Sequence, residues 1–193
     1  MNRIYSFISL SLIFAEIILI LLSWILSTIM TEGVRSLLSA EGIRWFVGHF
    51  SDMLLNQCLV WLILIAIGWG CLKNSRLLSF NPSDYRQKMA LKWSVITLLI
   101  YSLAICYLIF TPHAILISAT GELWPSPFSH ALIPVLSFGL LLVSVNYGLI
   151  SHSFKSITTV FNAMVNGICE ASSLIIVYVF AVQLYYSCCY VFL

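Results

Sequence analysis

The hydrophobic positions of the chain gather in five long and nearly unbroken runs, which short polar intervals separate. Runs of this length are typical of helices that cross a lipid bilayer, because about 20 apolar residues span its hydrocarbon core. The alternation of apolar and polar residues that marks membrane β-barrels is missing. We therefore expect an all-α integral membrane helical bundle of about five transmembrane helices, formed by residues 4–29, 54–72, 93–110, 131–150 and 171–193.

A polar interval at 31–52 has apolar residues on one helical side only, at Ile43, Val47 and Phe50 among others. This pattern is typical of an amphipathic helix that lies in the membrane interface. Ser39 is a suitable N-cap for such a helix. A short helix packed under a loop explains the pattern equally well.

A second amphipathic stretch runs over 155–170, and Gly167 is expected to mark a bend between it and the fifth span. In the fourth span, Pro134 is expected in the first helical turn, where its missing N–H costs little. Trp124 and Phe128 lie just before this span and suit the headgroup region.

Composition agrees with a membrane protein and excludes other classes. Of the 193 residues, 61% are hydrophobic and 8% are charged, and the mean hydropathy is +1.03. Soluble domains are roughly 25% charged. The net charge of +2 comes from scattered bases, which gives no patch for nucleic acid. Because the chain has no internal repeat or Gly/Ser linker, we expect 1–193 to form a single transmembrane helical domain, with the lipid bilayer as its surroundings.

The basic residues predict the orientation, because Lys and Arg concentrate on the cytoplasmic side of a membrane. The interval 73–92 holds five bases and one acid, whereas 111–129 holds no base. We therefore expect a multi-pass protein of the bacterial inner membrane, with a cytoplasmic N-terminus and a periplasmic C-terminus. Arg35 and Arg44 then lie outside. The bases inside are Arg3, Lys73, Arg76, Arg86, Lys88, Lys92 and Lys155.

Two blocks of sequence carry a resemblance to a known family. The first reads VRSLLSAEGIRW over 34–45. The second begins with a Pro-rich turn and continues through the fourth span to a basic residue, and its characteristic residues are Pro125, Ser126, Pro127, Phe128, Pro134, Tyr147, Gly148 and Lys155. In this order the two blocks resemble the AbgT family of p-aminobenzoyl-glutamate transporters.

The resemblance implies that a small anionic aromatic substrate, p-aminobenzoyl-glutamate or a related compound, is moved by an ion gradient through a dimeric protein. Members of the family are far longer and carry a re-entrant hairpin before the Pro-rich block, for which 78–86 leaves no room. We therefore expect a much shortened member that acts with a partner rather than alone, as a homo-oligomer or with another membrane protein. The alternative is a non-transporting scaffold or assembly subunit of a larger complex.

Four polar residues at membrane depth are the candidate functional residues: Glu16, Asn146, Glu170 and Gln183. The two amides are explained well by hydrogen bonds between helices, although the resemblance suggests that a Gln is common at position 183. Glu170 shares a polar helical face with Lys155, about four turns away, and lies either along an aqueous path or on a solvated surface.

Glu16 lies near the middle of the first span, where a charged side chain costs from roughly 2.5 to well over 10 kcal/mol. It is either a carboxylate that couples transport to a proton or cation, or a protonated acid that bonds a serine or carbonyl of a neighbouring helix. Its helical face also carries Tyr5, Ser9, Ser23 and Ser27, which indicates that this face packs against protein.

The sequence offers no chemistry for an enzyme, a metal site or a cofactor. The six cysteines lack the spacing of a zinc or iron–sulfur site, and the four histidines are scattered along the chain. No nucleophile motif or phosphate-binding Gly-rich loop is present. We therefore expect neither catalysis nor a bound cofactor.

Overall fold

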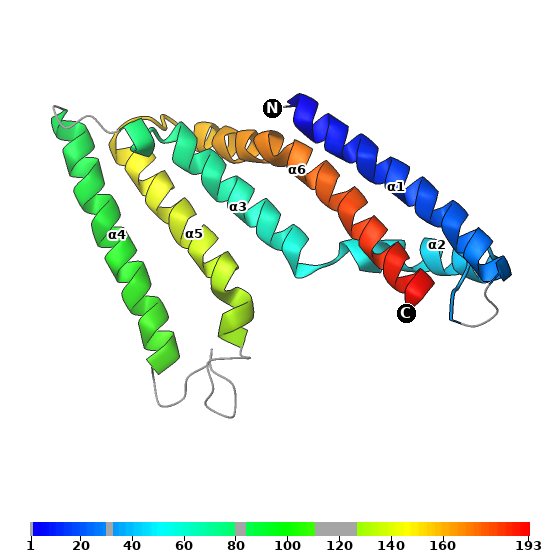
Figure 1. Ribbon diagram of the computed structural model, residues 1–193. Helices are drawn as coiled ribbons and strands as arrows, with labels where there is room; N and C mark the ends of the chain where they lie inside the picture. Colours follow the sequence, from blue (N-terminus) through cyan, green and yellow to red (C-terminus); the bar gives the residue numbers. More distant parts are fainter. Residues whose placement is uncertain (1, 30–32, 80–83, 111–126) are drawn as a thin grey trace. The chain divides into compact units, whose positions relative to one another are not determined.

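A computed structural model describes residues 2–29, 33–79, 84–110 and 127–193. Over these residues the chain is helical, with short connections and one 3₁₀ turn, η1, at Leu77–Ser79 (Figure 1). The predicted motif residues Pro125 and Ser126 lie outside this part of the chain. The helices are α1 (Asn2–Ile29), α2 (Ala40–Leu54), α3 (Gln57–Asn74), α4 (Tyr85–Phe110), α5 (Pro127–Ile150) and α6 (Ile157–Phe192).

Within the described ranges, five helices are long and apolar enough to cross a membrane, and α2 is the amphipathic exception. This confirms the prediction of an all-α membrane bundle. The N-cap prediction is also confirmed, because the Oγ of Ser39 accepts the N–H of Gly42 at 3.0 Å. This bond satisfies one of the free N–H groups that begin a helix.

The second amphipathic stretch and the fifth span form one continuous helix, α6, of 36 residues, in which Gly167 permits a close contact with α3. The bend expected at Gly167 stays a prediction, whereas the expectation for Pro134 is wrong. Pro134 lies inside α5 rather than in its first turn, because the helix already begins at Pro127. A proline at the first helical position lacks only an N–H that has no intrahelical partner, so Pro127 suits this start.

The chain divides into two compact units. Unit 1 comprises 1–60 and 172–193, and unit 2 comprises 61–171. Helices α3 and α6 each contribute residues to both units. The single transmembrane domain expected from the sequence stays a prediction. In its favour, α3 and α6 each continue without interruption from one unit into the other.

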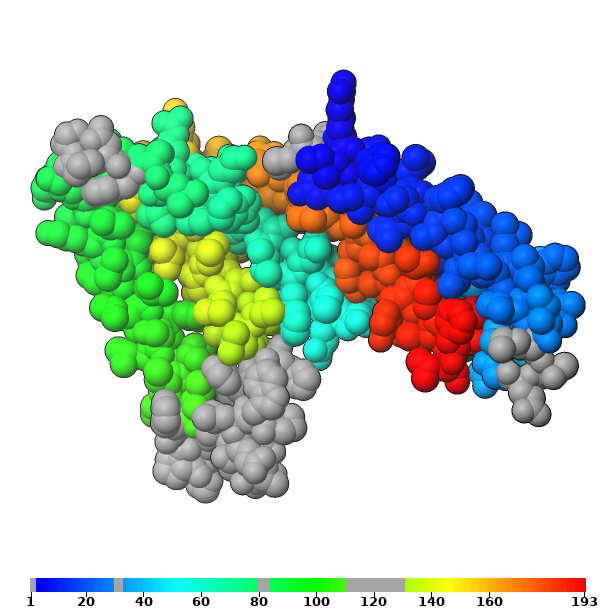
Figure 2. Space-filling view, viewed as in Figure 1, coloured from blue at the N-terminus to red at the C-terminus, as the bar shows by residue number. Residues whose placement is uncertain are grey.

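In unit 1, α1 and the C-terminal part of α6 lie side by side and run in the same direction (Figure 2). Near the start of α1, Ser9 lies with Ser173 at one cavity, and further along Glu16 bonds Ser187. The C-terminal ends of the two helices therefore lie on the same side of unit 1.

The segment 33–39 and α2 pack at this end of unit 1. The N–H of Leu37 donates to Ser23 Oγ of α1 at 3.2 Å, and the N–H of Arg35 donates to the carbonyl of Val191 in α6 at 3.1 Å. The Trp45 ring of α2 stacks on Tyr190 with 4.2 Å between centroids. These contacts attach α2 to both long helices of the unit.

In unit 2, α3 and the start of α6 cross at small residues. Gly70 and Gly167 face each other, and Ala66 and Ala163 lie one turn before them on their helices. Small residues let membrane helices approach closely, and here their backbones touch. Beside the crossing, Cys71, Phe154 and Ala163 form a buried apolar core.

Candidate functional site

Glu16 is buried in unit 1, with 9% of its surface exposed. Its Oε1 accepts the O–H of Ser187 in α6 at 2.6 Å. Its Oε2 has no hydrogen-bond partner among the described residues, and Glu16 lines a cavity of about 180 Å³ together with Ile20, Leu37 and Phe46. The predicted protein-facing side of α1 is confirmed, and the serine on a neighbouring helix is Ser187.

Gln183 lies one helical turn before Ser187 on α6 and is half-buried. Residues four apart share one face of a helix, so Gln183 points in about the same direction as Ser187. Unit 1 therefore holds two of the four candidate polar residues on adjoining helix faces.

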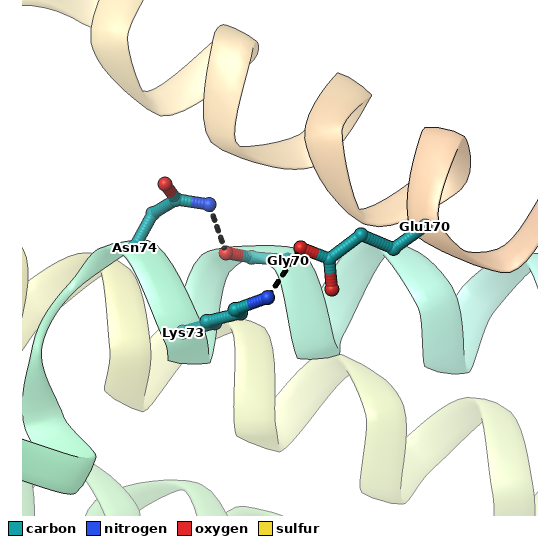
Figure 3. Close-up of polar contacts among 4 residues, drawn as sticks. All are labelled: Gly70, Lys73, Asn74 and Glu170. Atoms are coloured by element: carbon teal, nitrogen blue, oxygen red, sulfur yellow. Dashed lines mark hydrogen bonds and ion pairs between the residues drawn. The ribbon is translucent and has the colours of Figure 1, made fainter. Parts of the chain in front are cut away.

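Glu170 forms an ion pair that sequence reasoning missed. Its Oε1 lies 2.5 Å from the Nζ of Lys73 in α3, with about half of each side chain exposed (Figure 3). Next to this pair, Asn74 Nδ2 donates to the carbonyl of Gly70 at 2.8 Å. Lys73 and Glu170 are far apart in sequence, so only the crossing of α3 and α6 reveals the pair. The predicted helical face shared by Lys155 and Glu170 is wrong, because α6 begins at Ile157 and Lys155 lies exposed before it.

Asn146 joins α5 to α4, as expected of a mid-span amide. Its Nδ2 donates to Thr97 Oγ1 and, at 3.5 Å, to the carbonyl of Trp93. Further along the same pair of helices, Tyr101 O–H donates to the carbonyl of Val135 at 2.9 Å. These bonds show that α4 and α5 run in opposite directions.

The motif residues Tyr147 and Gly148 end α5 in a tightly packed turn. Tyr147 is fully buried, and a side chain at Gly148 would collide with the ring of Phe154. The chain reverses through His152, whose φ of 59° lies in the left-handed region, and the N–H of Phe154 donates to the carbonyl of Gly148 at 2.8 Å. The turn then exposes Lys155 directly before α6. A structural need for Gly148 is therefore evident, because the Phe154 ring occupies the space of its missing side chain.

A larger cavity of about 640 Å³ lies mainly between α4 and α5 in unit 2. Its polar lining residues are Tyr101, Ser102 and Ser144, and the rest of its lining is apolar or weakly polar sulfur. Among the residues that the structure describes, no three His, Cys, Asp or Glu side chains gather to hold a metal ion.

The comparisons with known proteins identify a family and a similar fold. The AbgT putative transporter family matches residues 76–188, which extend from the end of α3 into the last turns of α6. The crystal structure of the Alcanivorax borkumensis YdaH transporter, reported to have an unusual topology, matches with a TM-score of 0.74 and 13% identity. The match covers 93% of this chain and 70% of that chain, and at this identity it shows the fold. No curated protein matches the sequence significantly. Because the family match covers more than half of the residues, the chain belongs to the AbgT transporter family.

Proposed function

We propose that this chain is a transport subunit of the bacterial inner membrane that moves p-aminobenzoyl-glutamate or a related aromatic carboxylate and acts together with a second membrane chain. The observation that carries the proposal is the family match over 76–188. This match contains the fourth span, the buried turn at Tyr147 and most of α6. The transporter fold of the YdaH structure supports it.

The cavity between α4 and α5 supports a role for a second chain. Among the residues that the structure describes, its lining offers three hydroxyl groups and no Lys or Arg. A substrate with two carboxylates is bound best by cationic side chains and N–H donors placed around it. We therefore infer that the substrate contacts polar groups where this chain adjoins a second copy of itself or another membrane protein.

The arrangement of unit 1 supports the proposed orientation. Because α1 and the C-terminal part of α6 run in the same direction, the start of α1 and the end of α6 lie on opposite sides of the unit. If the N-terminus is cytoplasmic, the C-terminus is therefore periplasmic. The concentration of bases in 73–92 supports a cytoplasmic location for that segment.

Uptake of radiolabelled p-aminobenzoyl-glutamate tests the substrate. Inner-membrane vesicles from cells that express the chain are compared with vesicles that express Gly148→Leu, in which the new side chain collides with Phe154. Immunoblots adjust both sets to equal amounts of chain. We expect saturable uptake that needs an ion gradient and is lost in the variant. Uptake no greater than that of vesicles without the chain would overturn the substrate and favour a scaffold role, whereas equal uptake above that level in both sets would show that transport does not need the turn at Gly148.

A further inference from the structure

The amphipathic helix α2 presents three different surfaces around its axis. Successive residues of a helix are about 100° apart. Gly42 and Met53 therefore share one face, and both are buried against the rest of unit 1. A second face carries apolar side chains that unit 1 covers only in part, with exposed fractions of 55% at Ile43, 71% at Val47 and 37% at Phe50.

The third face of α2 is polar, and its charges are ordered. Glu41, Arg44 and Asp52 lie on this face and are exposed. At about 100° per residue, Arg44 lies on the edge next to the apolar stripe, whereas Glu41 and Asp52 lie on the edge next to the buried face. The base is therefore nearest to the exposed apolar side chains, and the acids are nearest to protein.

The place of α2 in unit 1 is consistent with a membrane surface. The contacts of Leu37 with Ser23 and of Trp45 with Tyr190 hold α2 against the C-terminal third of α1 and the last turns of α6. These two spans run in the same direction, so α2 lies where both approach the same face of the bilayer. Like α2, both spans expose apolar side chains there, among them Ile25 of α1 and Phe192 of α6.

We propose that α2 lies in the membrane interface, with Ile43, Val47 and Phe50 in the acyl chains of the lipids and Arg44 at the depth of their phosphate groups. An interfacial helix of a membrane protein needs one face toward protein, one toward hydrocarbon and one toward water, and α2 has all three. A cation next to the apolar stripe matches the anionic phosphate layer, and the acids point away from it. This inference does not depend on which substrate the chain transports.

Fluorescence quenching at two adjacent positions tests the proposal. An environment-sensitive dye is attached to Val47→Cys or, as the matched control, to Gly48→Cys, where open space surrounds the new side chain. The chain is placed in lipid nanodiscs, so that both membrane faces are accessible. The chain without an introduced cysteine, labelled in parallel, gives the background from its six native cysteines.

We expect lipids with brominated acyl chains to quench the dye at Val47 and to spare the dye at Gly48. Aqueous iodide should give the reverse order. Equal quenching of both positions by iodide would show that α2 stands in water and would overturn the proposal. Shielding of Val47 from both quenchers would overturn it as well, because a second copy or another protein would then cover the stripe.

Discussion

Gly70 of α3 and Gly167 of α6 touch through their backbones: a Cβ built on Gly70 lies 2.6 Å from the Cα of Gly167. A Cβ on Gly167 would in turn lie 2.8 Å from the Cα of Gly70. Contacts this short forbid any side chain at either position unless the helices separate. The crossing therefore depends on two glycines that neither helix needs for its own conformation.

Alanine at either glycine should separate α3 from α6. Overpacking typically costs about 1–3 kcal/mol, so we expect Gly70→Ala and Gly167→Ala each to lower the free energy of unfolding by that amount. The measurement is unfolding of the purified chain in mixed micelles by increasing denaturing detergent. Gly48→Ala is the control, because no atom lies within 4 Å of its new Cβ. Full stability of both crossing variants would show that the two helices do not touch.

The Lys73–Glu170 ion pair should contribute little to stability, but reversing one of its two charges should be destabilising. Because both side chains are about half exposed, the pair is expected to stabilise the fold by about 0.2–1 kcal/mol. Lys73→Glu places two acids together and should lower the unfolding midpoint, and the double change Lys73→Glu with Glu170→Lys should restore it. A double variant no more stable than Lys73→Glu alone would exclude a direct pair.

Glu16 should tolerate loss of its charge but not a change of sign. Glu16→Gln keeps an oxygen that accepts the O–H of Ser187, so we expect normal membrane insertion and stability. Glu16→Lys places a second donor against that hydroxyl at mid-span, where a lysine costs at least about 2.5 kcal/mol. Membrane-fraction immunoblots compare the amounts inserted. Normal amounts of the Lys variant would show that water or lipid headgroups reach this position.

Local patterns in the sequence predicted the elements and the faces of single helices. The spacing of Ser9, Glu16 and Ser23 identifies the inward face of α1, because residues three, four or seven apart lie together on a helix. Ser39 predicted the start of α2 for a similar reason, since its capping bond joins it to a residue three positions away.

Contacts between distant segments could not be predicted in the same way. Nothing near Lys73 indicates that Glu170 is its partner, because the pair depends on the crossing of two helices. The signal for that crossing was present, however, as an alanine four residues before a glycine in both α3 and α6. The sequence suggested a bend at Gly167, whereas the structure shows that this glycine serves close packing against Gly70.

Cysteine labelling in intact cells tests the orientation that the charges predict. A membrane-impermeant thiol reagent should label a cysteine at Gly48 and should not reach one at Ser79, which belongs to the basic segment that we expect in the cytoplasm. Both native side-chain positions are exposed, so burial does not decide the result. After the membrane is permeabilised, both cysteines should react. Labelling of Ser79→Cys alone in intact cells would reverse the orientation.

The need for a second membrane chain is the central claim, and uptake by the purified chain tests it most directly. The chain alone is reconstituted in liposomes with an imposed proton gradient and radiolabelled p-aminobenzoyl-glutamate, under conditions in which cross-linking shows monomers. Inner-membrane vesicles that contain the same amount of the chain serve as the reference. The account predicts saturable uptake by the vesicles and none above empty liposomes by the isolated monomer. Saturable uptake by the monomer would contradict it.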